Sequence, residues 1–237
     1  MNKFLSELNE VFTPDKVNKI RPKFILKYLE NNFEGLVEVN LYAPSSEIGS
    51  LTTLEATILV SFLKIINPNK IFEFGTFLGY SSSVFLKNTE KATVYTLDLE
   101  GEIKFNNNDL SKVLIDDNLN DKYLSYKQSL EGPIYLQQFL KSNDHRIKIL
   151  KSNSLTFDEA HFTDEIDFVF VDGGHLFDII KNDTEKSFKM LKKGGVIVWH
   201  DYDSKIHSDV TDFLDELSFS KKIFHIDNTL LAFHIIE

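Results

Sequence analysis

Residues 71–83, with the sequence IFEFGTFLGYSSS, contain the pattern that decides the fold. The apolar run Ile71–Phe74 predicts a short buried strand that ends at Gly75, and the residues from Tyr80 onward predict a helix. Glycines in such a turn let the backbone approach a ligand, and free N–H groups at the start of the helix face that ligand. The stretch therefore predicts a nucleotide-cofactor pocket built from a strand, a glycine turn and a helix.

The glycine spacing separates this turn from that of the dehydrogenases. A dinucleotide fingerprint requires Gly-x-Gly-x-x-Gly, but Phe77 and Tyr80 occupy the third and sixth positions counted from Gly75. The spacing is instead Glu-x-Gly-x-x-x-Gly, from Glu73 to Gly79. An ordinary strand–helix turn with two glycines would give the same pattern, so the interpretation depends on the rest of the chain.

The composition indicates a soluble globular protein. The chain has 237 residues, 42% of them apolar, and its 21 Phe residues are scattered through strand-like and helical runs, which predicts a substantial core. The net charge of −10 argues against nucleic acid as a partner, and the absence of cysteine excludes disulfides and thiolate metal ligands. No signal-peptide pattern is visible, and no uncharged apolar run reaches the roughly 18 residues of a membrane span. We therefore expect a cytoplasmic protein with no membrane partner.

The N-terminal part of the chain carries no motif. Apolar residues recur at helical spacing within residues 1–34, and residues 36–50 are typical of a loop. An apolar helix is expected from about Leu54 to Ile66, packed against the sheet. We therefore predict a helical N-terminal cap at 1–50 and the main domain at 51–237.

Two further predicted strands are followed by polar residues. The run from Ala92 to Leu97 predicts a second buried strand, and Asp98 comes directly after it. An acid at this place, about 20 residues beyond the glycine turn, can accept both ribose hydroxyls of a nucleotide. An ordinary polar strand end would look the same, and Glu100 is a rival for the role. The third strand, from Arg146 to Leu150, leads to Asn153.

The segment from Gly101 to Asp144 is longer than an ordinary connection between strands. It contains an Asn/Asp-rich run, IKFNNNDLSKVLIDDNLND, and a helix is predicted from Pro133 to Leu140. Loops of this length often form lids over a site. We expect the 101–132 insertion to cover the active site, although no residue in it identifies a ligand.

The stretch from Ile166 to Tyr202, IDFVFVDGGHLFDIIKNDTEKSFKMLKKGGVIVWHDY, predicts a buried strand, a helix and a second strand. The first strand ends in Asp-Gly-Gly-His at Asp172, and residues 192–195 should close the helix. The second strand, Val196–Trp199, ends in His-Asp-Tyr at Asp201. Because parallel strands bind ligands at their carboxyl ends, the two aspartates should lie close together.

These motifs, E-x-G-x-x-x-G and D-G-G-H followed by G-G-V-I-V-W-H-D-Y, resemble those of the class I S-adenosylmethionine-dependent methyltransferases, over roughly residues 50–237. The resemblance is to small-molecule O-methyltransferases related to the macrolide-sugar and catechol enzymes. It implies an α/β fold with a Rossmann-like, doubly wound, mostly parallel seven-stranded sheet in the order 3-2-1-4-5-7-6. The two strand-like runs at 222–226 and 230–236 would form its antiparallel C-terminal hairpin. The implied cofactor is S-adenosyl-L-methionine, and the implied partner is a small-molecule acceptor.

The resemblance also implies site residues. The expected cofactor cleft contains Glu73, Gly75, Thr76, Gly79, Ser81, Asp98, Asn153 and Asp172. Asn153 stands where the family more usually has Asp. In the relatives, acids equivalent to Asp172 and Asp201 hold Mg²⁺, which orients the acceptor hydroxyl. The catechol type has Asn directly after the second acid, whereas this chain has Tyr202 there. The resemblance alone therefore does not imply a full Mg²⁺ site.

Two histidines follow the paired acids. His175, three residues beyond Asp172, is the candidate general base, so we expect catalysis from His175, Asp172 and Asp201. His200 alternates away from Asp201 on its strand and should point into the sheet packing. The remaining histidines receive no role: His145, His161, His207, His225 and His234.

Two other functions stay open on the same scaffold. One is a metal-dependent oxygenase or hydrolase, similar to the cephalosporin-hydroxylase family, with Asp172, His175, His200 and Asp201 as ligands. The other is a non-catalytic module that binds the cofactor without turnover. The sequence fixes neither the acceptor nor whether its O, N or C atom is methylated, and it leaves a homodimer as one option for the oligomeric state.

Overall fold

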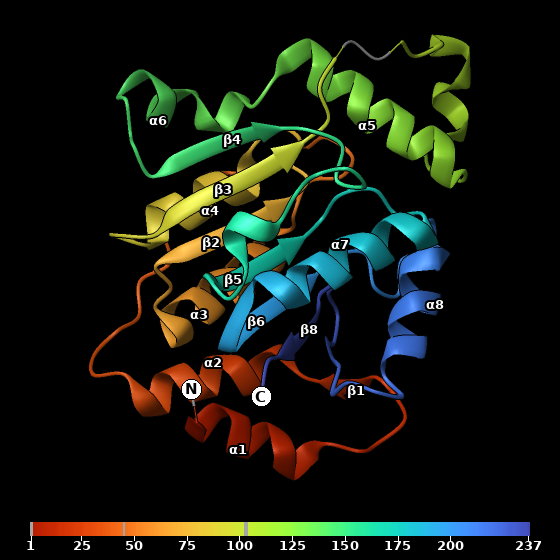
Figure 1. Cartoon of the computed structure of the whole chain (residues 1–237). Coiled ribbons are helices and arrows are strands. Elements are labelled where there is room, and N and C mark those ends of the chain that lie inside the picture. Colours follow the sequence, from red (N-terminus) through yellow and green to blue (C-terminus); the bar gives the residue numbers. More distant parts are fainter. Residues whose placement is uncertain (1, 45, 102–103) are drawn as a thin grey trace.

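An eight-stranded sheet runs through the described part of the molecule, with helices on both faces (Figure 1). The computed structural model describes residues 2–44, 46–101 and 104–237. Residue 45 of the predicted loop and residues 102 and 103 of the predicted insertion lie outside the described residues.

The strands are β1 (Asn18–Ile20), β2 (Lys70–Phe74), β3 (Thr93–Asp98), β4 (Ile147–Lys151), β5 (Ile166–Val171), β6 (Leu191–Trp199), β7 (Phe224–Ile226) and β8 (Ala232–Ile235). The α-helices are α1 (Asn2–Val11), α2 (Pro22–Asn32), α3 (Thr53–Ile66), α4 (Tyr80–Asn88), α5 (Asp117–Glu131), α6 (Gln137–Lys141), α7 (Phe177–Met190) and α8 (Ser208–Leu217). Short 3₁₀ helices are η1 (Asn107–Lys112), η2 (Ile134–Leu136) and η3 (Ala160–Phe162). None of these helices is both long enough and apolar enough to cross a membrane.

The strand order is β1-β7-β8-β6-β5-β2-β3-β4. Strands β2 to β6 pair in parallel, and β8 is antiparallel to both β6 and β7. The predicted fold class is therefore confirmed, including the order of the seven expected strands and the antiparallel C-terminal hairpin.

The eighth strand, β1, comes from the segment for which we predicted a helical cap. It pairs in parallel with β7, where Ile20 faces Ile226. Its entry turn is held by Asn18, whose side chain accepts from the N–H of Thr13 at 2.7 Å and donates to the carbonyl of Thr13 at 2.8 Å. A strand of three residues is too short for alternation to be read from the sequence.

Helix α3 begins as the sequence predicts. Thr52 accepts from the N–H of Glu55, and Glu55 accepts in return from the N–H of Thr52, which forms a capping box. The other carboxylate oxygen of Glu55 accepts from the N–H of Leu230 at 2.9 Å. One buried acid therefore fixes both the start of α3 and the turn between β7 and β8.

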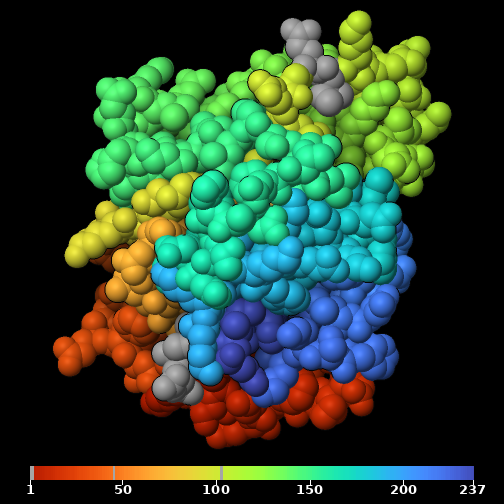
Figure 2. Space-filling view, in the orientation of Figure 1, coloured from red at the N-terminus to blue at the C-terminus, as the bar shows by residue number. Residues whose placement is uncertain are grey.

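The sheet separates two apolar cores. Alternate residues of each strand face opposite sides, so Phe168 packs with α3 and α4, whereas Phe72 and Trp199 pack with α7 and α8. Helices α1 and α2 close the α3 side at the β1 end of the sheet, and α5 and α6 lie at the opposite end. The space-filling view shows these N-terminal residues in red and the α5–α6 region in green, with the sheet layers between them (Figure 2).

Residues 192–195 follow the end of the helix, as the sequence predicts, but they belong to the next strand. Helix α7 ends at Met190, and β6 begins at once with Leu191, which pairs with Ile166. The register shifts before Phe168 pairs with Val196, so the intervening residues form an irregular stretch of strand. The sequence predicted only the regular part of β6, because glycines normally mark turns.

The long insertion contains an unpredicted helix. Helix α5 has 15 residues, and only Asn120 among them is buried, so it lacks the apolar face from which helices are usually recognised. The helix predicted from Pro133 to Leu140 is present as η2 followed by α6.

Gly75 lies at the tightest point of the sheet edge. Its φ is +95°, and a Cβ built there would lie 1.9 Å from the carbonyl oxygen of Asp172. We had expected Gly75 to leave space for a cofactor, but the nearest obstacle is the protein backbone itself.

We expect Gly75→Ala to destabilise the fold by more than the roughly 1–3 kcal/mol of backbone strain alone. Gly101→Ala is the matched control, because Gly101 has a φ of +110° and, its chain neighbours aside, no atom of the described residues lies within 4 Å of a built Cβ. Urea unfolding of both variants measures the difference. Equal losses of unfolding free energy would contradict the backbone collision.

Candidate active site

A cavity of about 880 Å³ opens at the carboxyl ends of the parallel strands. Its volume lies in the range of pockets that bind small molecules and cofactors. Its wall includes one predicted site residue at or just after the end of each central strand: Gly75, Asp98, Asn153, Asp172 and Asp201. The prediction that these strand ends meet at one edge is confirmed. Helix α5 contributes a further wall.

Asp98 holds the glycine turn from the next strand. Its carboxylate accepts from the N–H of Phe77 at 2.9 Å and from the N–H of Leu99 at 2.8 Å. Burial raises its pKa, and the nearby charge of Lys151 opposes that rise. Each carboxylate oxygen has a second lone pair, so Asp98 can still accept hydrogen bonds from the hydroxyls of a ligand in the cavity. The rival Glu100 is exposed and does not line the cavity.

Glu73 lies behind the cavity wall and not on it. It is fully buried and accepts hydrogen bonds from the hydroxyls of Ser81, Ser82 and Thr96, the last at 2.5 Å. Thr76 joins this network through Thr96 at 2.8 Å. Burial raises the pKa of Glu73 to about 7, despite the three hydroxyl donors. Glu73, Thr76 and Ser81 therefore support the turn from beneath and do not line the cavity.

Gly79 also lies outside the cavity lining. It is the N-cap of α4 with a φ of +79°, and a Cβ there would lie 2.7 Å from Leu136 of η2. This glycine allows η2 to pack on the start of α4.

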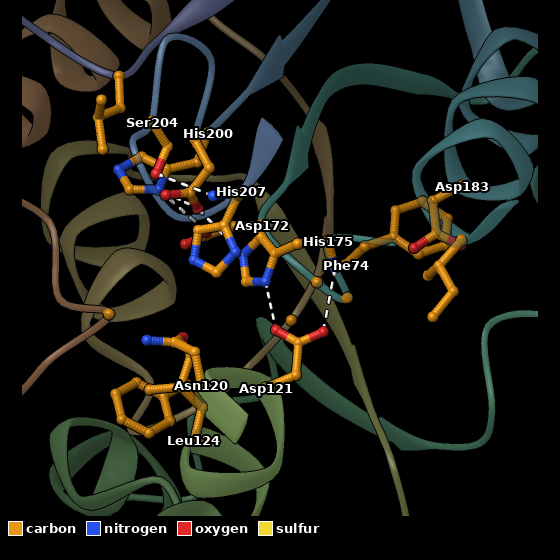
Figure 3. Close-up of a pocket in the computed structure, with 18 of the residues that line it drawn as sticks. Phe74, Asn120, Asp121, Leu124, Asp172, His175, Asp183, His200, Ser204 and His207 are labelled. Carbon is orange, nitrogen blue, oxygen red and sulfur yellow. Dashed lines mark hydrogen bonds and ion pairs between the residues drawn. The ribbon is translucent and has the colours of Figure 1, made fainter. Parts of the chain in front are cut away.

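The β4 end of the cavity holds Asn153 and an acid that we did not predict. The side-chain oxygen of Asn153 accepts from the N–H of Leu155 at 2.9 Å. Asp183 of α7 lines the same region, and burial raises its pKa to about 6. Figure 3 shows Asp183 on the side of the cavity away from the histidines. Its position within a helix gave no sequence signal.

Asp172, His175 and Asp201 come together at the other end of the cavity. One ligand atom from each lies within 4.8 Å of the others. The Nε2 atom of His175 is 3.1 Å from Asp201, and its Nδ1 atom is 2.5 Å from Asp121 of α5. Burial alone would lower the pKa of His175, but the charge of Asp201 and the hydrogen bonds to both acids raise it well above its usual value.

His200 was predicted to point into the sheet packing, and this is wrong. Its Nδ1 atom lies 2.8 Å from Asp201 and 3.3 Å from Asp172, and the residue lines the cavity. The backbone at Asp201 turns to a φ of +64°, so strand alternation no longer applies there. The charges of Asp201 and Asp172 outweigh burial and raise the pKa of His200 well above its usual value.

The Nε2 atom of His200 faces Glu55. It lies 3.6 Å from the Glu55 carboxylate and has no hydrogen-bond partner among the described residues. Burial would raise the pKa of Glu55, but His200 and the backbone donors lower it to about 2. Glu55, which caps α3, is therefore also the outermost charged group of the network around His200 and Asp201.

Three residues of this end were missed from the sequence. His207 was given no role, but its ring stacks on that of His175 with centroids 3.6 Å apart. Its Nδ1 atom lies 2.5 Å from Asp117, which precedes Asp121 by one turn of α5. The i, i+4 spacing of Asp117 and Asp121 was the available signal, but it is informative only if the segment is known to be helical.

The sheet order, the glycine turn and the cavity at the carboxyl edge define a Rossmann-like α/β protein with a cofactor-sized site. The sequence matches the methyltransferase domain family over residues 72–202, which is more than half of the chain. The protein belongs to that family. A comparison with curated proteins finds no match.

Solved structures of methyltransferases share the fold. TomG, an O-methyltransferase of tomaymycin synthesis from Streptomyces achromogenes solved with S-adenosylmethionine, is 15% identical, with 79% of this chain and 82% of that chain covered and a TM-score of 0.52. PaMTH1 from Podospora anserina, solved with S-adenosylhomocysteine, is 11% identical, with coverages of 99% and 94% and a TM-score of 0.54. An O-methyltransferase from Bacillus cereus, also in complex with S-adenosylhomocysteine, is 13% identical, with coverages of 89% and 96% and a TM-score of 0.53.

The buried acid Glu73 should make the stability depend on pH. Its pKa is about 7 in the folded protein against 4.5 ordinarily, so the folded state binds more protons between these values. Stability is then lost as the pH rises through this window, by on the order of 3 kcal/mol. Glu73→Gln should remove this loss, and Glu90→Gln, at an exposed site, should keep it. Denaturant unfolding at pH 4.5 and 7.5 measures the unfolding free energy of both variants. If Glu73→Gln lost as much unfolding free energy between these pH values as the wild type, the assignment would be contradicted.

Proposed function

We propose that the protein transfers the methyl group of S-adenosyl-L-methionine to a hydroxyl of a small molecule. The observation that carries the proposal is a single cavity that joins the glycine turn and Asp98 to the acid and imidazole groups around Asp172. Membership of the methyltransferase domain family and the O-methyltransferase names of its structural neighbours support it.

The residues at the β2–β3 end of the cavity fit the cofactor. Asp98 would accept the ribose hydroxyls, and the backbone at Gly75 would lie against the cofactor chain. Asn153, with Asp183 beside it, would face the adenine. The cofactor supplies an activated methyl group on a sulfonium, so the protein must orient the acceptor oxygen and accept one proton.

Asp172 is the group that we propose as the proton acceptor. Both ring nitrogens of His175 face carboxylates, and Asp201 Oδ2 lies near two imidazoles, so neither is free to take a proton. The Asp172 side chain is 17% exposed, and its one ion-pair partner among the described residues is His200 at 3.3 Å. A general-base role for His175 stays a prediction. It requires that the contact of His175 with either Asp121 or Asp201 breaks.

Magnesium at Asp172 and Asp201 also stays a prediction. The two side chains provide oxygen donors, and a bound Mg²⁺ would lower the pKa of an acceptor hydroxyl. Two imidazoles already surround Asp201, and the Tyr202 hydroxyl donates to Asp215 at 2.8 Å, away from the pair. The proposed reaction therefore has no step at this ion.

The division into a cap of residues 1–50 and a methyltransferase domain of residues 51–237 stays a prediction, as does cytoplasmic location. A homodimer stays one option for the oligomeric state.

Cofactor binding should depend on Asp98. Asp98→Ala should weaken S-adenosylmethionine binding by about 1.5–3 kcal/mol, the range for hydrogen bonds to a charged group. Isothermal titration calorimetry measures the change, and Glu100→Ala serves as the neighbouring control outside the cavity. Unchanged affinity in Asp98→Ala, or binding of NAD in place of S-adenosylmethionine, would remove this part of the proposal.

Methyl transfer should depend on Asp172. A panel of phenols, sugars and amines is screened with cofactor labelled in its methyl group. With the best acceptor, Asp172→Asn should lower turnover by roughly 10²–10⁴-fold, the usual contribution of a general base, while cofactor affinity is kept. Asp178→Asn, an exposed acid on the following helix, is the control.

The same assay separates the alternatives. Binding without transfer to any acceptor would favour a non-catalytic module, and iron-dependent oxygen consumption without transfer would favour an oxygenase.

A further inference from the structure

Two aspartates of α5 contact two histidines, one that follows β5 and one at the N-cap of α8. Asp117 and Asp121 are one helical turn apart and therefore project from the same face of α5. Asp117 Oδ1 lies 2.5 Å from His207 Nδ1, and Asp121 Oδ1 lies 2.5 Å from His175 Nδ1. The four side chains each offer one ligand atom, and all these atoms lie within 4.8 Å of one another.

The two imidazole rings lie face to face. Their centroids are 3.6 Å apart and their planes are inclined by 21°. Figure 3 shows His175 and His207 next to each other, with Asp121 below them. Two protonated rings at this distance would repel each other. One divalent cation between the Nδ1 atoms and the aspartates would balance both carboxylates and leave both rings neutral.

The surroundings of His175 match those of a metal ligand. A ligating histidine usually donates its other ring N–H to a carboxylate, which fixes the orientation of the ring. If Nδ1 of His175 binds a metal, Nε2 carries the proton, and Asp201 Oδ2 lies 3.1 Å from it as the acceptor. Asp201 is itself held by His200 at 2.8 Å. Asp201 thus lies where we expect a carboxylate that orients a metal-binding histidine without binding the metal itself.

The donor set selects the kind of metal. Two imidazole nitrogens and two carboxylate oxygens suit first-row divalent transition metals such as Zn²⁺, whereas Mg²⁺ prefers oxygen ligands in an octahedron. Both histidines are nearly buried, with residue exposures of 6% and 5%. The ligands would therefore be held by packing before the ion arrives.

We propose that Asp117, Asp121, His175 and His207 form a binding site for a divalent transition-metal ion that fixes α5 against the sheet edge. Helix α5 also supplies Leu124 and Gln128 to the cavity wall, so the ion would set the shape of the acceptor end. This inference goes beyond the proposed methyl transfer and does not rest on it.

The test is metal titration of the full-length protein after treatment with a chelator. We expect one Zn²⁺ per chain by calorimetry, and Co²⁺ in the same site should give the visible absorption of a four-coordinate ion. Asp121→Asn and His207→Gln each remove a metal ligand. They should weaken binding by more than the roughly 10–100-fold expected when a residue that only orients a ligand is replaced. Asp201→Asn should fall within that roughly 10–100-fold range.

Two variants serve as controls. Asp116→Asn makes the same charge change next to the cluster and keeps the N-cap of α5, because Asn caps as well as Asp. Asp172→Asn removes the other candidate metal ligand. Both should bind Zn²⁺ as the wild type does.

Two results would overturn the proposal. One is a wild-type protein that is folded by circular dichroism and binds S-adenosylmethionine but neither Zn²⁺ nor Co²⁺. The other is metal binding that is lost in Asp172→Asn and kept in His207→Gln, which would place the ion at Asp172 and Asp201. Failure of the proposed methyl transfer would instead appear as lost cofactor binding or turnover with metal binding intact.

Discussion

The close approach of Gly75 to Asp172 is the constraint on which the rest of the site depends. The turn after β2 passes so near the end of β5 that no side chain fits between them. The same turn is tied to β3, because the N–H of Gly75 donates to the carbonyl of Leu97 and Asp98 accepts from the N–H of Phe77. Three strand ends therefore form one rigid edge, with the proposed cofactor groups on one side of the turn and the proposed reacting groups on the other.

The charged groups of the site come from elements that are far apart in the sequence. Asp201 faces His175 and His200, and each histidine faces a further acid on a helix, Asp121 or Glu55. Buried ions of this kind are stable only when each has a partner. The alternation of acids and imidazoles therefore fixes the positions of α3 and α5 relative to the sheet, as well as lining a cavity.

The sequence was informative where local rules apply. Glycine spacing and β-branched runs predicted the strands and the meeting of Asp172 with Asp201, because parallel strands place their ends at one edge. His200 and His207 could not be placed, because their directions depend on an irregular turn and on packing against a distant helix. Helix α5 was missed for a related reason: polar contacts hold it to the site, and no apolar periodicity marks it.

The short strand β1 has a consequence for assembly. It occupies the hydrogen-bonding edge of β7, so the antiparallel end of the sheet does not present β7 to a second molecule. Open edges invite strand-to-strand association, and a three-residue edge strand offers little backbone for it. Two copies therefore cannot extend one continuous sheet through β7.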